Sequence, residues 1–169
     1  MTADLLRARQ RFLGTLAIVH REGRVLRFST VRLRTYPITG EWVKSLNEDM
    51  VAAEMLEAFV SRFGRMQDTI GDKLIPRALA AQAERQGSVL DNLARAEYLG
   101  WMASAAEWLT ARELRNRLVH EYADDPEALA TDIRSAIEFV PMLMRTYGNM
   151  RRVALEALGV ADAALPPLL

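Results

Sequence analysis

Apolar residues recur at intervals of three or four positions along most of the chain, which is the spacing of one face of an α-helix. Five segments carry this pattern: residues 4–20, 41–63, 89–102, 104–122 and 126–147. Glycine and proline, which disfavour helix interiors, stand between several of these segments. The pattern predicts an all-α domain in which neighbouring helices run antiparallel.

Residues that commonly begin helices precede three of the segments. Thr39, Ser88 and Asp125 are predicted N-caps, because a short side chain with an oxygen accepts hydrogen bonds from first-turn amides. Pro126 suits the first turn of the last helix, where its missing N–H costs nothing. Bends or breaks are predicted at three further positions: Gly64, Gly71 and Pro76.

The first 38 residues are predicted to form an N-terminal extension. The helix over 4–20 is expected to end before Gly23, and the stretch RVLRFSTVRLRTYPI at 24–38 is rich in β-forming residues. This composition favours an extended arm or a short hairpin. The predicted bundle then occupies residues 39–160, and residues 161–169 form a tail.

Charge is distributed unevenly along the chain. The formal net charge of the 169 residues is zero, so the chain lacks the overall basic character of many nucleic-acid-binding proteins. However, residues 1–34 carry eight arginines against Asp4 and Glu22, a balance of +6, and the remainder carries −6. This asymmetry indicates either an anionic partner near the N-terminus or a solvated arginine face.

Composition excludes several classes of site. The chain has no cysteine, which rules out disulfides, cysteine-based zinc sites and thiol catalysis. It shows no secretory signal and no uninterrupted apolar run of about 18 residues. Because its length is typical of one domain, we expect a single soluble, cytoplasmic domain.

The segment 104–122 places a charged residue within an apolar stripe. At about 100° per residue, one side of this helix gathers Trp108, Ala111, Arg115, Leu118, Val119 and Tyr122. An unpaired charge in a core is costly. Arg115 is therefore expected to meet an acid, to reach solvent past the stripe or to lie at an interface.

A second group of polar residues lies on an adjacent face of the same segment. Arg112, Asn116 and His120 follow one another at four-residue spacing. Histidine exchanges protons near neutral pH, and arginine binds phosphate through a charged planar fork. These groups suffice for metal-independent RNA cleavage, in which a base deprotonates the ribose 2′-hydroxyl and a cation stabilises the phosphorane. Arg115 and His120 point about 140° apart on an ideal helix, so their convergence needs arginine's long reach, distortion near the helix end or a second chain, which a twofold dimer would supply. A solvated polar face is the alternative.

Other candidate residues are assigned structural roles. Asp68 and Asp72 lie four apart, but two acids without a histidine make a poor metal site, so a solvated face is expected. Arg117 is expected to pair with Glu113, and His20 is expected at the surface or at a helix end. Three tryptophans are expected in the core or at an interface: Trp42, Trp101 and Trp108.

Residues 115–122, RNRLVHEY, resemble a known signature. Arg115, four intervening residues, His120, one residue and Tyr122 match the R-x4-H-x-Y pattern of HepT-type HEPN proteins. Asn116 matches the polar residue that such motifs favour after the arginine. The resemblance is strongest over residues 88–147 and extends in helical layout over 40–147, whereas residues 1–38 lie outside it.

The resemblance implies a homodimeric ribonuclease toxin of a type VII-like toxin–antitoxin system, built on an antiparallel up-and-down four-helix bundle. Arg115 and His120 would line a composite cleft at the dimer interface, with Asn116 as the orienting residue and Arg112 as a further RNA contact. A minimal nucleotidyltransferase of the MntA type would silence the nuclease by attaching AMP to Tyr122. No metal, other cofactor, DNA or membrane is expected to take part.

Two other functions remain open from the residues alone. The same arginine and histidine are compatible with a non-catalytic subunit that holds a nucleotide or substrate for a nucleotidyltransferase. The chain is also compatible with a plain helical interaction module.

Overall fold

The computed structural model describes residues 2–120 and 125–169, with the backbone alone at His120. Every regular element in these ranges is a helix. The elements are α1 (Ala3–Leu33), α2 (Gly40–Ser45), α3 (Met50–Thr69), the π-helix η1 (Ile70–Leu74), α4 (Ile75–Ala81), α5 (Val89–Tyr98), α6 (Ala105–His120), α7 (Pro126–Glu156) and the 3-10 helix η2 (Asp162–Ala164). The predicted all-α class is confirmed for these residues.

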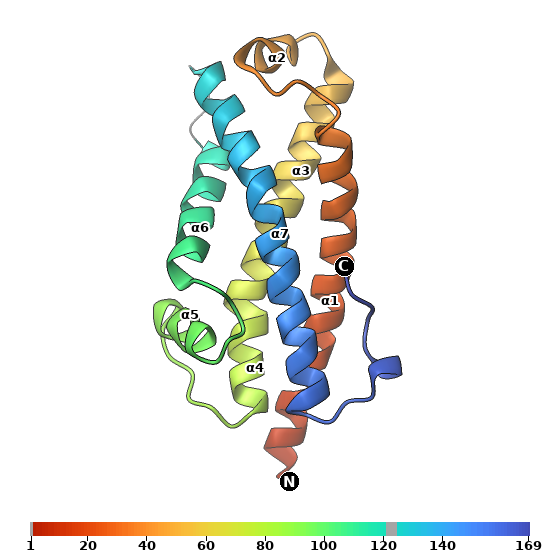
Figure 1. The fold of residues 1–169 in the computed structure, drawn as a ribbon, viewed down its shortest axis with the longest axis vertical. Helices are drawn as coiled ribbons and strands as arrows, with labels where there is room; N and C mark the ends of the chain where they lie inside the picture. Colours follow the sequence, from red (N-terminus) through yellow and green to blue (C-terminus); the bar gives the residue numbers. More distant parts are fainter. Residues whose placement is uncertain (1, 121–124) are drawn as a thin grey trace.

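The long helices pack side by side as a bundle (Figure 1). α1 packs against α3, α4 and α7, and α6 packs against α3, α5 and α7. The short helices α2 and α5 lie near opposite ends of the bundle (Figure 1). One hydrophobic core runs through all the long helices, and its largest fully buried side chains include Phe12, Phe59, Phe63, Trp108 and Tyr147.

α1 is a single helix, so the predicted end before Gly23 and the predicted extended arm after it are both wrong. Its buried side chains continue at helical spacing to the end of the helix: Leu26, Ser29, Thr30 and Leu33. Packing of this face against α3 outweighs the weak strand preference of the segment. Gly23 allows close packing, because a Cβ there would overlap the Leu169 side chain and lie 3.1 Å from Cε of Met66.

The long helix predicted from residue 41 is divided into two. Thr39 is an N-cap as predicted, but the helix that it begins is the short α2. Asp49 then accepts a hydrogen bond from the amide of Ala52 at 3.0 Å and begins α3. α2 packs on α7, where the amide of Gly40 donates to the Glu127 carboxylate at 2.8 Å. The chain between α2 and α3 thus breaks where α2 turns to pack on α7, a helix far away in the sequence.

A change of helix type, and not a loop, occupies the region of the predicted breaks. Gly64 lies inside α3 without interrupting it, and Gly71 lies in η1, which leads directly into α4. Pro76 has no N–H, and in an α-helix its ring would collide with the carbonyl four residues earlier. The wider π turn that precedes Pro76 accommodates both effects and keeps the chain helical.

The other predicted caps are confirmed. Ser88 and Asp91 form a reciprocal capping box at the start of α5, which ends at Tyr98 and not at the predicted residue 102. Asp125 accepts a hydrogen bond from the amide of Ala128 at 3.0 Å, and Pro126 is the first residue of α7.

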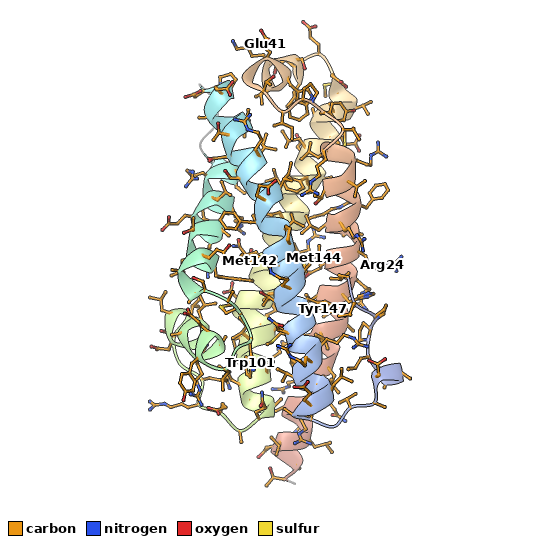
Figure 2. The ribbon with its side chains drawn as sticks, in the orientation of Figure 1. Arg24, Glu41, Trp101, Met142, Met144 and Tyr147 are labelled. Carbon is orange, nitrogen blue, oxygen red and sulfur yellow. The ribbon has the colours of Figure 1, made fainter. Side chains whose placement is uncertain are left out.

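The residues after α7 fold back along the bundle. The Tyr147 hydroxyl donates to the Pro167 carbonyl at 2.9 Å, and Arg151 donates to the Pro166 carbonyl and to the Asp162 carboxylate, each at 2.6 Å. Figure 2 labels Tyr147 on the part of α7 beside which this segment returns. Within the described ranges, none of the helices combines the length and apolar character that crossing a bilayer requires.

Candidate functional site

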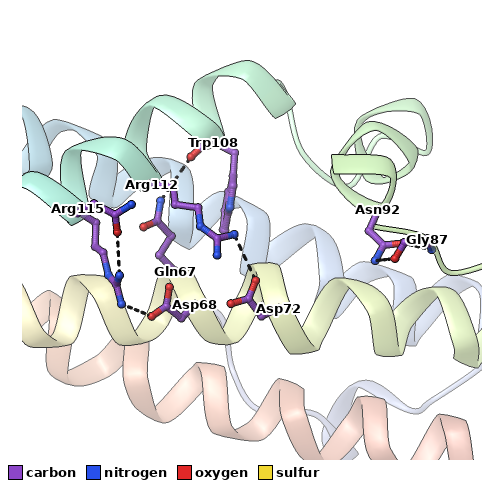
Figure 3. A network of polar contacts seen from close by, with 9 residues as sticks. Gln67, Asp68, Asp72, Gly87, Asn92, Trp108, Arg112 and Arg115 are labelled. Carbon is purple, nitrogen blue, oxygen red and sulfur yellow. Dashed lines mark hydrogen bonds and ion pairs between the residues drawn. The ribbon is translucent and has the colours of Figure 1, made fainter. Parts of the chain in front are cut away.

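Arg115 on α6 lies across α3 at the position of a glycine. A Cβ added to Gly64 would lie 3.0 Å from Nε of Arg115, so the absence of a side chain there makes room for the arginine. Nη2 of Arg115 donates to Oδ2 of Asp68 at 2.5 Å, and Nη1 donates to Oδ1 of Asn116 at 2.9 Å (Figure 3). Of the three placements expected for Arg115, the structure has it meeting an acid.

A second, looser pair follows one turn away. Nη1 of Arg112 lies 3.4 Å from Oδ1 of Asp72 (Figure 3). The two acids are four residues apart along α3 and η1, and the two arginines are three apart along α6. The side chains of Asp68 and Asp72 are 38% and 39% exposed, in line with the predicted solvated face, but each carboxylate also pairs with an arginine on α6. Sequence spacing within one helix gives no sign of such partners on another.

A groove of about 880 Å³ runs beside these pairs, between α3, η1 and α6. Its apolar lining consists of Leu56, Val60, Leu118, Val119 and Leu129. Among the residues that the structure describes, its charged lining is balanced, with three acids and three bases: Glu57, Asp68, Asp72, Arg65, Lys73 and Arg115. Nε of Arg115 is buried and has no hydrogen-bond partner among the residues 2–120 and 125–169 that the structure describes. A volume of this size accommodates a nucleotide-sized ligand.

The indole of Trp108 fixes α6 against η1 next to the groove. Trp108 is 1% exposed, and a Cβ on Gly71 would lie 3.2 Å from its Nε1. Nε2 of the buried Gln67 donates to the Trp108 carbonyl at 3.5 Å (Figure 3). Trp42 and Trp101 are also buried, which confirms the expectation for all three tryptophans.

No protein-family model, curated protein or solved structure matches this chain. The function is therefore inferred from the motif residues and from the groove that Arg115 enters.

The remaining motif residues lie at the end of α6. His120 is its last residue, and the His120 side chain lies outside the described part of the structure. Tyr122 lies outside the described residues as well. The structure therefore brings Arg115, Asn116 and Arg112 together with Asp68 and Asp72, and the positions of the His120 imidazole and of Tyr122 stay predictions.

The stripe predicted on α6 is correct in part. Trp108, Ala111 and Leu118 are buried as expected, but Val119 is 52% exposed. Leu114, which was not assigned to the stripe, is 2% exposed. The buried side of α6 is therefore rotated from the predicted stripe toward Leu114 and away from Val119. Arg115 lies at the edge of this buried side, where its side chain can turn into the groove.

Arg117 pairs across helices. Its Nε and Nη2 donate to the Asp132 carboxylate on α7 at 2.9 and 3.1 Å, in place of the expected pair with Glu113. In the described ranges, no group of three or more histidine, cysteine, aspartate or glutamate side chains is arranged to hold a metal ion.

Proposed function

We propose that the chain is an RNA endonuclease of the HepT-like HEPN class, acting as a cytoplasmic homodimeric toxin. The observation that carries this proposal is the position of Arg115, the first residue of the R-x4-H-x-Y motif, at a groove with both polar and apolar lining. The up-and-down course of the long helices (Figure 1) also supports it, although one of the four, α1, comes from residues 1–38, which lie outside the resemblance.

In the proposed reaction, His120 acts as the general base and Arg115 as the phosphate-binding cation. The imidazole removes the proton of a ribose 2′-hydroxyl, and the 2′-oxygen forms a bond to the adjacent phosphorus. Arg115 stabilises the charge that develops on the phosphoryl oxygens. The bond from phosphorus to the 5′-oxygen breaks, and His120 of the second copy donates a proton to that oxygen. A 2′,3′-cyclic phosphate and a 5′-hydroxyl end result.

Asn116 and Arg112 have supporting roles in this proposal. Asn116 accepts a hydrogen bond from Arg115 and so holds one arm of the guanidinium. Arg112, one turn earlier on α6, is the further contact for the RNA backbone. AMP attached to Tyr122 by a MntA-type nucleotidyltransferase would bring negative charge near Arg115 and compete with RNA phosphate.

The proposal is tested with two variants, His120→Ala and Arg115→Ala, expressed in a host and assayed as purified protein on RNA. Each is expected to abolish growth inhibition and to lower cleavage by about 100-fold or more, the usual contribution of a general acid–base group at His120 and of a charge-stabilising group at Arg115. Thr110→Ala is the matched control, because Thr110 is exposed on the same helix and hydrogen-bonds only to the Ala106 carbonyl four residues earlier. Equal toxicity and equal RNA decay in His120→Ala would refute the nuclease.

A second candidate function is a nucleotide-binding subunit of a nucleotidyltransferase that cleaves nothing. The volume of the groove favours it, because about 880 Å³ suits a mononucleotide. Calorimetric titration of the purified chain with AMP and ATP distinguishes the two functions. Tight mononucleotide binding that is lost in Arg115→Ala, together with no RNase activity in the dimer, would replace the nuclease by this binding role.

A further inference from the structure

One side of α1 carries exposed arginines that the proposed nuclease site does not use. We call this surface the α1 basic face, and it consists of His20, Arg24, Arg27, Phe28, Val31 and Arg32. These residues line a groove of about 540 Å³ whose other wall is formed by residues 167–169. Figure 2 shows Arg24 at the outer edge of α1, pointing away from the bundle.

The charge on this face is not balanced. As far as the described residues go, the lining holds three arginines and one histidine but no aspartate or glutamate. In the part of the chain that the structure describes, no ion pair or hydrogen bond joins Arg24, Arg27 or Arg32 to an acid. The described lining of the groove beside Arg115, by contrast, has as many acids as bases. A concave surface of one sign attracts counter-ions, so the α1 basic face selects anions.

An exposed aromatic ring lies among these charges. Phe28 is 58% exposed and Val31 is 61% exposed, although both are large apolar side chains. The guanidinium carbon of Arg32 lies 5.5 Å from the centroid of the Phe28 ring. Cationic groups next to an accessible aromatic face are the combination by which proteins hold single-stranded nucleic acid, through phosphate contacts and base stacking.

The face is held rigidly from both sides. The opposite side of α1 is buried in the core through Leu16, Val19 and Leu26. Tyr147 donates to the carbonyl of Pro167 in the other wall of the groove, and Arg151 donates to the Pro166 carbonyl just before it. The backbone of both walls is therefore fixed before a ligand arrives, and the ordering cost of binding falls on the exposed side chains.

We propose that the α1 basic face binds single-stranded RNA, with Arg24, Arg27 and Arg32 on phosphates and a base stacked on Phe28. The three arginines span about 12 Å along the helix. The face lies on the far side of the bundle from α6 (Figure 1), so it is a binding surface separate from the Arg115 groove. The choice of RNA over DNA rests on the proposed nuclease function, whereas the affinity for a single-stranded polyanion does not.

A membrane surface fits this face less well. Helices that lie in a bilayer interface keep a continuous apolar side free for the lipid. The apolar side of α1 is committed to the protein core, and its basic face is hollowed. An anionic vesicle therefore serves as a competing probe in the test.

The test measures binding of a fluorescein-labelled single-stranded oligouridylate by anisotropy, with the full chain carrying His120→Ala so that RNA is not consumed. Adding Arg24→Glu and Arg27→Glu together is expected to weaken binding at least tenfold and to reduce the salt slope by about 1.4, since each single-strand phosphate contributes about 0.7. Phe28→Ala is expected to weaken binding at least fivefold, and Phe28→Trp is expected to preserve it. The matched control is Arg85→Glu with Arg145→Glu, which makes the same charge change at two exposed arginines outside the face.

Three outcomes would overturn the proposal. Binding of the Arg24→Glu, Arg27→Glu protein within twofold of its parent is one, and an equal loss in the Arg85→Glu, Arg145→Glu control is another. The third is retention of the chain on phosphatidylserine vesicles or by a polyglutamate peptide without measurable RNA binding. If the nuclease proposal is refuted, this test still stands, because the test measures RNA binding by a chain that carries His120→Ala.

Discussion

At the scale of single residues, the Arg115 guanidinium donates to two side-chain oxygens of its own chain, one from Asp68 and one from Asn116. A carboxylate presents two oxygens to a guanidinium much as a phosphate does. Asp68 thus occupies Arg115 in the absence of RNA. For the proposed nuclease, binding a phosphate at Arg115 requires the arginine to leave this carboxylate.

Replacing Asp68 by asparagine should therefore favour RNA. The change Asp68→Asn keeps the shape of the side chain and removes the competing charge, so we expect severalfold tighter RNA binding in the His120→Ala background. The side chains of Arg115 and Asp68 are 29% and 38% exposed, so the fold should lose no more than about 1 kcal/mol. Anisotropy titration and thermal unfolding measure the two effects.

Asp72→Asn is the control for this prediction. Asp72 pairs with Arg112 at the longer distance of 3.4 Å, so its replacement should change RNA binding less. Weaker binding by a folded Asp68→Asn protein would show that Asp68 positions Arg115 and does not compete for it.

At the scale of elements, α1 shows how packing overrides local preference. Its second half contains β-branched and aromatic residues and follows a glycine, yet it stays helical because one side is buried against α3 and α7. The glycines inside these helices also depend on packing, because some face solvent and others face a buried side chain of another helix. Gly14 lies on the exposed side of α1 with nothing within 4 Å of an added Cβ, whereas Gly71 faces the Trp108 indole at 3.2 Å.

This difference predicts opposite effects of two substitutions. Gly14→Ala should stabilise the fold by about 0.5–1 kcal/mol, because alanine loses less backbone entropy in a helix. Gly71→Val should destabilise it by about 1–3 kcal/mol, since the added atoms collide with a buried ring. Urea unfolding followed by circular dichroism measures both changes. A destabilised Gly14→Ala protein would contradict the continuous, solvent-facing course of α1 at this residue.

At the scale of the whole molecule, one core joins the first helix to the last segment. The returning residues 157–169 close this core at α1 and α7, and Tyr147 lies at the junction. Burial raises the pKa of Tyr147 to about 12, and the nearby Arg151 charge lowers it only in part. The folded state therefore keeps the phenol protonated at a pH where the unfolded chain releases the proton.

Alkaline stability should depend on Tyr147. Its contribution is fully present below pH 10, the ordinary pKa of tyrosine, and is lost as the pH rises to about 12. The difference between these pKa values corresponds to a loss on the order of 2–3 kcal/mol. Tyr147→Phe lacks the ionising group, so its free energy of unfolding should fall less steeply over this range. Parallel urea titrations of the two proteins at pH 8, 10, 11 and 12 measure the difference, and identical slopes would contradict it.

The sequence by itself determined the all-α class, the N-caps at Thr39, Ser88 and Asp125, and the helical periodicity of the last segment. Each of these depends on interactions within a few residues, either a side chain bonding a nearby amide or apolar groups recurring at helical spacing. The motif residues Arg115, Asn116 and Arg112 were likewise identifiable, because their spacing along one helix is visible in the chain. The break before Asp49 could also have been predicted from the sequence, since Asp49 is an ordinary N-cap that follows the polar residues 47 and 48.

Only the tertiary structure decided which groups those helices bring together. The continuity of α1 past Gly23 depends on surfaces supplied by α3 and α7, and the pairs of Arg115 with Asp68 and of Arg117 with Asp132 join residues on different helices. The arginine excess of the α1 basic face is visible in the sequence, but its concave shape appears only once residues 167–169 form its second wall. Such contacts form between positions far apart in the chain, and local periodicity contains no information about which of them will meet.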